Sequence, residues 1–408
     1  MIRMKDFIFI LGKNIDLSIA EIVSYLEKKK IKFTIVEKGT NFLIIRSDEE
    51  TCEKIIDDLG GTIKIGEVLY AFEFKDIKTS EMRFQELDFS QIFSELPQKL
   101  LFGVSSYGIR KWKTFAKILK KKMKEYGIKS SYFNIPKERS WLTHVEVIKK
   151  GMAKDSVEFL ICRGKNLYIG RTIAVHNPFE FQKRDVGRPH QRTIFSIPPR
   201  LARIMINLSK VEKGELLLDP FCGIGSILQE AVLFGIKIIG IDIDEKCVKY
   251  CKKNLEWLSQ EYRLDIENLD NIIVKGDSLD LPSYLQKNSV DAIVTEPYLG
   301  PPLKRKPKKH DAMQILKELN GFYGRAIRQM VKVLKPGKRI VIVSPCFRVG
   351  KEIKGIDIKK IVKGIERGKK ARIVDPLSKY GIKHKFPFYD FEQRHKTLRQ
   401  INVIEKIK

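Results

Sequence analysis

A carboxylate, a proline and a tyrosine stand together where a strand is expected to end. The segment TEPYLGPP, residues 295–302, follows the apolar run DAIV at 291–294. Gly and Pro after a strand commonly mark only a turn. Glu296 and Tyr298 add a hydrogen-bond acceptor and an aromatic ring to this turn, and these groups make a catalytic loop the alternative interpretation.

A second candidate site lies earlier, in ELLLDPFCGIGSILQEA at 215–231, which has the pattern of an apolar strand, a glycine turn and a helix. Gly223 and Gly225 allow the backbone to approach a ligand, and the helix that follows offers free N–H groups. Asp219 stands ahead of the glycines, where it would repel a pyrophosphate but could accept hydrogen bonds from an ammonium group. The turn therefore favours a ligand that carries an amino group.

Four successive strands of this region end in polar residues. Besides Asp219, these are Asp242 with its neighbour Asp244 in IIGIDID, Asp277 after NIIVKG, and Glu296. In an open α/β sheet, ligands bind at the carboxyl ends of the strands, and an acidic residue about 20 positions after the glycines suits the hydroxyls of a ribose. A nucleoside that bears an amino acid, S-adenosylmethionine, fits these features better than NAD.

The motifs DPFCGIGS (219–226), GIDID (240–244), GDS (276–278) and EPYL (296–299) resemble, in this order, those of S-adenosylmethionine-dependent amino-methyltransferases. With GRPHQRTIFSIPPRLARIMINLS and a basic α/β region before them, the chain resembles more narrowly the THUMP-domain tRNA guanine-N2-methyltransferases that act on guanosine 10. The resemblance covers essentially the whole chain and is strongest over residues 185–300. It implies an α/β and α+β fold class, with an N-terminal ferredoxin-like domain plus THUMP module and a C-terminal Rossmann-like class I methyltransferase sheet.

The resemblance also implies how S-adenosylmethionine is bound. Asp219 and the loop of Gly223 and Gly225 would hold its methionine part, and Asp242 would bind its ribose hydroxyls. Asp277, with the serine that follows it, would contact the edge of its adenine. The implied cofactor-binding residues are Asp219, Pro220, Phe221, Gly223, Gly225, Asp242, Asp277 and Ser278.

For the segment at 295–302, the resemblance implies methyl transfer to an exocyclic amine whose lone pair is delocalised into the ring of the base. Glu296 and the carbonyl of Pro297 would accept hydrogen bonds from this amine, and Tyr298 would stack on the flipped-out base. The segment departs from the usual D-P-P-Y motif, because Glu replaces Asp, Tyr298 replaces the second Pro, and Leu299 stands in the aromatic position. This departure leaves open which amine is the target and whether the site is active.

The composition limits the class of protein that must position these residues. At 408 residues the chain is long enough for two or three domains, and 43% hydrophobic with 31% charged residues is typical of a folded chain. Lys and Arg number 78 against 50 Asp and Glu, and the net charge of +28 favours a polyanionic partner such as nucleic acid. A genome-wide bias towards Lys and Ile codons is the alternative explanation of this charge.

Membrane insertion and export are not expected. No apolar run reaches the roughly 18 residues of a membrane span. The N-terminal segment MIRMKDFIFILGKNIDLS carries Asp6 in its apolar stretch and lacks a small-residue cleavage site, so it predicts a strand rather than a signal peptide. The six cysteines form no C-x-x-C, and no histidine lies at metal-ligand spacing from one of them. We therefore expect reduced thiols, no metal site and a cytoplasmic location.

Three domains are expected from the order of the predicted elements. Residues 1–75 alternate as β-α-β-β-α-β, the ferredoxin-like arrangement, and contain no catalytic cluster. Residues 76–178 form a second small α/β unit, which the resemblance identifies as a THUMP-like RNA-binding domain. Over residues 179–408, strands, glycine turns and helices repeat, which predicts an open, Rossmann-like α/β sheet with helices on both faces.

Basic residues suited to nucleic acid lie on a predicted helix, ahead of the glycine turn and after the candidate catalytic loop. The helix WKTFAKILKKKMKEYG at 112–127 has lysines on one face, and PPLKRKPKKH at 301–310 is rich in Lys and Arg. Solvated surface is the alternative for both stretches. Arg394 and Arg399, near the C-terminus, are expected to be surface charge. The candidate nucleic-acid contacts are Lys117, Lys121, Arg188, Arg192, Lys304, Arg305 and Lys306.

Three functions remain. The first is a tRNA guanine-N2-methyltransferase, with tRNA as partner and, as in some relatives, a small activator subunit. The second is a DNA methyltransferase that acts on the amino group of adenine or cytosine, although no helix-turn-helix is visible for reading a DNA sequence. The third is a catalytically degenerate RNA-binding protein, against which the intact Asp219, Gly223, Gly225, Asp242 and Asp277 argue. The methylated position and the number of methyl groups stay open.

Overall fold

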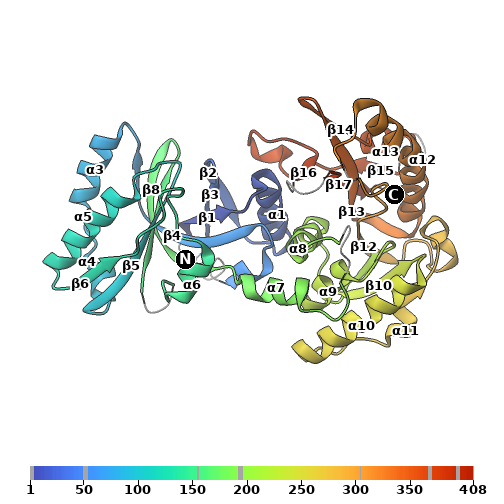
Figure 1. Cartoon of the computed structure of the whole chain (residues 1–408), viewed down its shortest axis with the longest axis horizontal. Helices are drawn as coiled ribbons and strands as arrows, with labels where there is room; N and C mark the ends of the chain where they lie inside the picture. The colour runs from blue at the N-terminus through green and yellow to red at the C-terminus, as the bar shows by residue number, and fades with distance from the viewer. Residues whose placement is uncertain are drawn as a thin grey trace. The chain divides into compact units, whose positions relative to one another are not determined.

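The computed structural model describes residues 4–48, 54–153, 156–191, 196–303, 305–365, 370–391 and 396–407. The chain forms two compact units, residues 1–15 with 30–180 and residues 16–29 with 181–408, and each unit contains one sheet (Figure 1). In the described ranges, no helix is both long and apolar enough to cross a bilayer.

The first unit is built on an eight-stranded sheet in the order β2-β3-β1-β4-β8-β7-β5-β6. β1 lies between β3 and β4, and both of these pairings are antiparallel, as the predicted β-α-β-β-α-β arrangement requires. β4 also pairs with β8, so the sheet continues from the strands of residues 1–75 into those of residues 76–178. The strands are β1 (Met4–Leu11), β2 (Phe33–Lys38), β3 (Phe42–Asp48), β4 (Thr62–Glu73), β5 (Lys99–Tyr107), β6 (Lys129–Tyr132), β7 (Glu158–Arg163) and β8 (Asn166–Val175).

The helices of the first unit follow β4 along the chain. α1 (Ile15–Lys28) belongs almost entirely to the second unit, although it follows β1. Of the second helix expected in the N-terminal domain, residues 49–53 lie outside the described part, and a short 3-10 helix, η1, spans Ile56–Asp58. The helices of the first unit are α3 (Ile77–Glu86), α4 (Ser90–Ser94), α5 (Trp112–Glu125) and α6 (His144–Lys149), and α7 (Pro178–Val186) begins where the two units meet in the sequence.

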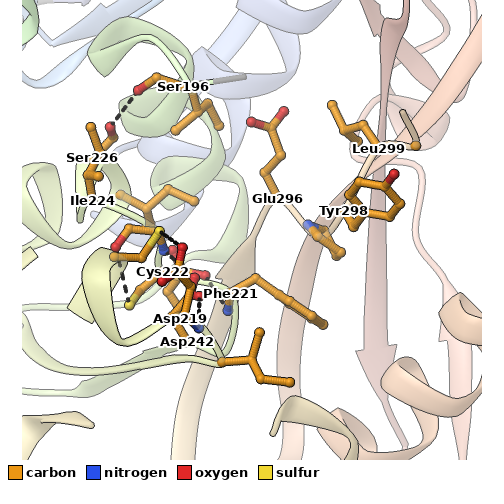
Figure 2. A pocket seen from close by; sticks show the side chains of 18 of the residues that line it. Ser196, Asp219, Phe221, Cys222, Ile224, Ser226, Asp242, Glu296, Tyr298 and Leu299 are labelled. Carbon is orange, nitrogen blue, oxygen red and sulfur yellow. Dashed lines mark hydrogen bonds between the residues drawn. The ribbon is translucent and has the colours of Figure 1, made fainter. Parts of the chain in front are cut away.

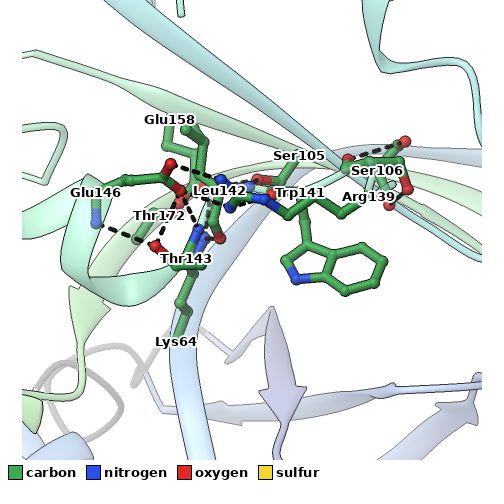
Figure 3. Close-up of polar contacts among 11 residues, drawn as sticks. Lys64, Ser105, Ser106, Arg139, Trp141, Leu142, Thr143, Glu146, Glu158 and Thr172 are labelled. Carbon is green, nitrogen blue, oxygen red and sulfur yellow. Dashed lines mark hydrogen bonds and ion pairs between the residues drawn. The ribbon is translucent and has the colours of Figure 1, made fainter. Parts of the chain in front are cut away.

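An ion pair lies in the core of the first unit (Figure 3). Lys64 of β4 and Glu158 of β7 have no exposed side-chain surface, and Lys64 Nζ lies 2.5 Å from Glu158 Oε1. The hydroxyls of Ser105 and Thr172 donate to Glu158 at 2.5 and 2.6 Å, and Lys64 also donates to the carbonyl of Leu142 at 2.8 Å. Burial lowers the pKa of Lys64, and the attraction of Glu158 opposes this shift. The network joins β4, β5, β7 and β8 to the segment before α6.

The second unit contains a nine-stranded sheet in the order β11-β10-β9-β12-β13-β17-β15, with β14 on β13 and β16 on β17. β9 to β13 pair in parallel, and β17 is antiparallel to β13. From β9 the chain continues to β10 and β11 on one side and to β12 and β13 on the other. The predicted Rossmann-like sheet is confirmed, and its switch point lies between β9 and β12. The strands are β9 (Leu216–Asp219), β10 (Lys237–Asp242), β11 (Ile273–Lys275), β12 (Val290–Thr295), β13 (Leu334–Val349), β14 (Glu352–Gly355), β15 (Ala371–Ile373), β16 (Phe388–Asp390) and β17 (Leu398–Lys406).

The strands of the switch point are held from both faces. Every residue of β12 is buried, as expected of a parallel strand that is covered on both sides. α8 begins at Pro199 after Pro198, and proline fits the first turn of a helix. The helices of this unit are α8 (Pro199–Ser209), α9 (Ser226–Leu233), α10 (Glu245–Tyr262), α11 (Leu269–Ile272), α12 (Lys309–Val333) and α13 (Ile358–Gly364), with 3-10 helices at Ser278–Ser283 and Ser378–Tyr380.

Candidate active site

A cavity of about 550 Å³ lies at the carboxyl ends of β9, β10 and β12 (Figure 2). Its walls come from the loops that follow these strands and from Ser196 and Ile197, ahead of α8. Of the site residues predicted from the sequence, those that line this cavity are Asp219, Phe221, Gly223, Asp242, Glu296, Pro297 and Tyr298. Four predicted cofactor residues are not part of the lining, namely Pro220, Gly225, Asp277 and Ser278.

The turn after β9 requires its two glycines. Gly223 and Gly225 have φ angles of +53° and +89°, in the left-handed region that side chains disfavour. A Cβ at Gly225 would also lie 2.7 Å from Cys251 Sγ. The amide of Cys222 donates to the carbonyl of Ile241 at 3.0 Å and ties the turn to β10. Gly225 therefore shapes the turn from behind, while Gly223 lines the cavity.

Asp219, at the end of β9, is a buried carboxylate with one oxygen already engaged. Thr295 Oγ1 and the amide of Phe221 both donate to Asp219 Oδ1, at 2.7 and 3.2 Å. Burial raises the pKa of Asp219 to about 7, although these two hydrogen bonds oppose the shift. Because the side chain lines the cavity, its second oxygen can accept a hydrogen bond from a cationic ligand.

Asp242, at the end of β10, links two loops of the site. The amide of Gly223 donates to its Oδ2 at 2.8 Å, and the amide of Asp244 donates to its Oδ1 at 2.9 Å. A carboxylate can accept about four hydrogen bonds, so two positions are left for the hydroxyls of a ligand. Asp242 therefore supports the glycine turn in addition to its predicted role in binding ribose.

The predicted adenine contacts lie beside the cavity, at the end of β11. Asp277 is exposed and accepts a hydrogen bond from the amide of Leu279 at 2.8 Å, and Ser278 is buried. These positions act locally as the start of a 3-10 helix. Their contact with adenine stays a prediction.

Glu296 is held by an arginine that we expected at the surface. Arg399 Nε donates to Glu296 Oε1 at 2.5 Å, and its Nη2 donates to Oε2 at 3.3 Å. The same Nη2 donates to the carbonyl of Ser196 at 3.2 Å, and Asp390 lies 3.9 Å from Nη1. Arg399 was expected to be surface charge, and this expectation is wrong, because the residue is only 2% exposed. It belongs to β17, which lies inside the sheet between β13 and β15. Arg394, the other expected surface charge, lies outside the described residues.

The two residues after Pro297 both line the cavity but differ in their exposure. Tyr298 lines the cavity and is 56% exposed, whereas Leu299 is 4% exposed. The buried hydroxyl of Tyr323 donates to the carbonyl of Tyr298 at 3.1 Å and fixes the backbone there. The accessible aromatic ring of this loop is therefore one position earlier than in the usual motif.

The candidate nucleic-acid residues fall into three groups. Lys117 and Lys121 are exposed and line a groove of about 1210 Å³ between α5 and β6 in the first unit. Arg305 and Lys306 are exposed in the second unit, while Arg192 and Lys304 lie outside the described residues. The predicted contact with nucleic acid is wrong for Arg188. This residue is 3% exposed and donates to Ser226 Oγ at 2.7 Å and to Ser196 Oγ at 2.9 Å. A guanidinium enclosed in this way cannot reach a phosphate of a large nucleic acid.

The sequence of this chain is similar to known protein families and to individual proteins. Residues 189–348 match a family described as RMKL-like, methyltransferase domain, and residues 74–253 match one described as DNA methylase. A tRNA (guanine(10)-N2)-dimethyltransferase from Methanothermobacter thermautotrophicus is 29% identical over 304 residues, which are 73% of this chain and 78% of that protein. The protein of the same name from Pyrococcus abyssi is 30% identical over 213 residues, 52% of this chain and 58% of its own length.

Among solved structures, TrmN from Thermus thermophilus has the same fold. The TM-score is 0.54 at 15% sequence identity, and the match covers 98% of this chain and 100% of that chain.

Proposed function

Since this chain belongs to the family of tRNA guanine-N2-methyltransferases, we propose that it transfers a methyl group from S-adenosylmethionine to the exocyclic N2 of a guanosine in tRNA. The names of the two relatives lead us to propose position 10 and up to two methyl groups. The observation that carries the proposal is the Glu296 carboxylate, which lines the same cavity as Asp219 and Asp242.

The residues of the cavity fit S-adenosylmethionine. Asp219 offers an oxygen to an ammonium group, Asp242 retains acceptor positions for ribose hydroxyls, and Gly223 leaves the wall open. When bound there, S-adenosylmethionine supplies a methyl group that its sulfonium already activates. The remaining cofactor contacts of the proposal are Pro220, Phe221, Gly225, Asp277 and Ser278.

Guanine is the base that a carboxylate at position 296 favours. A carboxylate only accepts hydrogen bonds. Guanine presents a ring N–H beside its amine, whereas adenine and cytosine present a ring acceptor beside theirs. The two oxygens of Glu296 can therefore receive two neighbouring donors of guanine. This complementarity supports guanine over the adenine or cytosine of the DNA alternative.

The chain's own groups prepare the amine. Glu296 and the carbonyl of Pro297 accept its hydrogens, which favours a lone pair localised on N2, and the exposed ring of Tyr298 stacks on the flipped-out base. Arg399 holds Glu296 in place through two hydrogen bonds. After transfer, N2 must lose one proton, and Glu296 is the acceptor that already faces it. Positioning of this kind is a large part of catalysis when the methyl group is activated beforehand.

The proposal is tested with labelled S-adenosylmethionine and an unmodified tRNA transcript, followed by nuclease digestion and mass spectrometry of the nucleosides. N2-methylated guanosine is expected at position 10, and a transcript with adenosine at that position should stay unmodified. Methylation of duplex DNA instead would favour the DNA amino-methyltransferase, to which the match of residues 74–253 points. Product formed by the isolated chain would exclude an obligatory activator subunit.

The affinity for S-adenosylmethionine is expected to rise with pH and to level off above about pH 7. The binding form of Asp219 is the carboxylate, and burial raises its pKa to about 7, so below this pH the group must first lose a proton. Below about pH 7, the dissociation constant should therefore increase about tenfold for each unit by which the pH is lowered. Isothermal titration calorimetry between pH 5.5 and about 7.5 measures this dependence. Asp219→Asn should bind more weakly and without the slope, and an unchanged slope in this variant would assign it to another group.

Lys117 and Lys121 are expected to contact the tRNA backbone as part of the THUMP-like region that we propose at residues 76–178. They lie four positions apart on α5 and face the same groove. Replacing both by Gln should weaken tRNA binding and lower the salt dependence by about one unit of slope per lysine. Filter binding over a range of salt concentrations measures both the affinity for tRNA and its salt dependence. Lys75→Gln with Lys78→Gln is the matched control, because these lysines are exposed in the same unit and lie outside the groove. Equal losses in both variants would point to net charge alone.

A further inference from the structure

We propose that α12 sets the geometry between the bound cofactor and the target base, with Phe322 and Tyr323 as its positioning residues. Neither side chain lines the cavity, so each would act through a residue that does. Phe322 contacts Phe221 in the turn after β9, and Tyr323 contacts Tyr298 in the loop after β12. The proposal rests on the proposed function for the reaction that this geometry serves.

Tyr323 holds the backbone from which the ring of Tyr298 extends. Its side chain is fully buried, and its hydroxyl donates to the carbonyl of Tyr298 at 3.1 Å. Burial and the negative charge of Glu296 raise the pKa of Tyr323 well above its usual range, so the hydroxyl keeps its proton and stays a donor. Because Tyr298 is 56% exposed, the place of its ring depends strongly on this backbone. A loop that moved would carry the stacking ring with it.

α12 also approaches the backbone two residues further along this loop. Gly300 has a φ angle of +97°, and a Cβ there would lie 3.1 Å from Ile315 and 3.4 Å from Leu319 of α12. The glycine therefore allows the helix and the loop to come close together. With the hydrogen bond at Tyr298, the loop is held against α12 at two points.

Phe322, the neighbour of Tyr323 in the helix, supports the cofactor turn. Its ring packs edge-on against that of Phe221, with centroids 5.6 Å apart and an angle of 67° between the planes. Phe221 lines the cavity, and its amide donates to Asp219 Oδ1 at 3.2 Å. The rings of Phe322 and Tyr323 also pack against each other, with centroids 5.6 Å apart. Two adjacent residues of α12 therefore join the turn that carries Asp219 to the loop that carries Tyr298.

The rest of α12 gives these contacts a rigid base. The helix spans 25 residues, and its apolar face belongs to the same buried cluster as side chains of β9, β12 and β13. Side chains in such a core are closely packed and hold defined positions. A misplacement of about 1 Å between reacting groups can cost about 100-fold in rate. A small shift of either loop against α12 should therefore slow methyl transfer even where both ligands still bind.

Tyr323→Phe tests the contact on the side of the target base, because it keeps the ring and removes only the hydroxyl. With the full chain and saturating tRNA, kcat should fall about tenfold, whereas the dissociation constant of S-adenosylhomocysteine should change by less than about twofold. A tRNA with 2-aminopurine in place of the target guanosine reports the stacking itself, because this base is brighter when it is unstacked. Its fluorescence in the complex should rise towards the level in Tyr298→Ala, which lacks the stacking ring.

Phe322→Leu tests the contact on the side of the cofactor. Loss of the aromatic pair with Phe221 should weaken binding of S-adenosylhomocysteine by about two- to tenfold in isothermal titration calorimetry. The fluorescence of 2-aminopurine should stay at the level of the unmodified chain, since Tyr323 keeps its hydrogen bond. Changes of both readouts in both variants would overturn the proposal, because α12 would then only stabilise the unit as a whole.

Tyr380→Phe is the matched control for Tyr323→Phe. It removes a tyrosine hydroxyl of the same unit, which donates to Glu27 and does not line the cavity. If kcat and fluorescence in Tyr323→Phe equalled those of this control, the positioning role would be overturned while the proposed function stood. If the unmodified chain methylated no tRNA, the proposed function would fall and the role of α12 with it. The two failures are therefore distinguishable.

Discussion

Replacing Glu296 by Gln is expected to lower kcat for methyl transfer to tRNA by about 100-fold or more. The amide has nearly the same shape, but it presents one acceptor and an NH₂ donor where the carboxylate presents two acceptors. The donor would face the N–H groups of the base. Single-turnover assays at saturating tRNA and S-adenosylmethionine measure the loss. The affinity for S-adenosylmethionine should change little, because Asp219 and Asp242 keep their places.

The same variant is expected to be less stable, and a second substitution separates the two effects. Without Glu296, the carboxylate that remains near the buried Arg399 in the described part of the chain is that of Asp390, 3.9 Å away. Breaking a buried pair from one side costs up to about 3–5 kcal/mol. The double variant Glu296→Gln with Arg399→Gln removes both charges and should recover most of this stability in calorimetry. Its kcat should stay low. Recovery of activity in the double variant would mean that Glu296 only neutralises Arg399.

The Glu296–Arg399 pair also gives a physical reason for the departure from the usual motif. Glu is one methylene longer than Asp, and this side chain meets the guanidinium of Arg399 at 2.5 Å while it lines the cavity. Glu296→Asp would retract the carboxylate by about 1.5 Å, and a misplacement of about 1 Å can cost 100-fold in rate. We therefore interpret Glu at this position as matched to Arg399 rather than as a sign of an inactive site.

The parts of the site that sequence could predict are those that depend on local patterns. A carboxylate at the end of each apolar strand, and glycines in the turn after β9, indicate the edge of the sheet, because parallel strands bring their carboxyl ends together. Arg188 and Arg399 could not be placed in this way. Each is buried by elements far along the chain, and Arg is mostly exposed unless paired. Their polar neighbours in the sequence suggested surface instead.

The fold could be predicted from the sequence to about the same extent as the site. The Rossmann-like order of β9 to β13 follows from the strand, turn and helix repeats and is confirmed. The pairing of β4 with β8 was not predicted, because strand neighbours in antiparallel sheets depend on contacts far apart in sequence. The placement of α1 in the second unit was not predicted either, because it also depends on contacts far apart in the sequence. One of these is the hydrogen bond that Asn207 of α8 donates to Glu21 of α1 at 2.9 Å.

Replacing Lys64 by Met is expected to lower the free energy of unfolding of the first unit by about 3–5 kcal/mol. Met keeps much of the length of the side chain but leaves the Glu158 carboxylate without its cation, at a site with no exposed surface. The carbonyl of Leu142 loses its donor as well. Urea unfolding followed by tryptophan fluorescence measures the change. A Trp257→Phe background restricts the signal to the first unit, which holds the other two tryptophans of the chain.

Two further variants decide whether the charge pair itself is responsible. Lys64→Met with Glu158→Gln should recover part of the loss, because the buried charge is gone while the amide oxygen can still accept from one of the two hydroxyls that bind Glu158, those of Ser105 and Thr172. Lys78→Met removes an exposed lysine of the same unit and should change stability by no more than about 0.5 kcal/mol. If Lys64→Met cost no more than Lys78→Met, apolar packing and backbone pairing would suffice to join β4, β5, β7 and β8. The affinity for S-adenosylmethionine should be unchanged in all three variants, because every residue that lines the cavity belongs to the second unit.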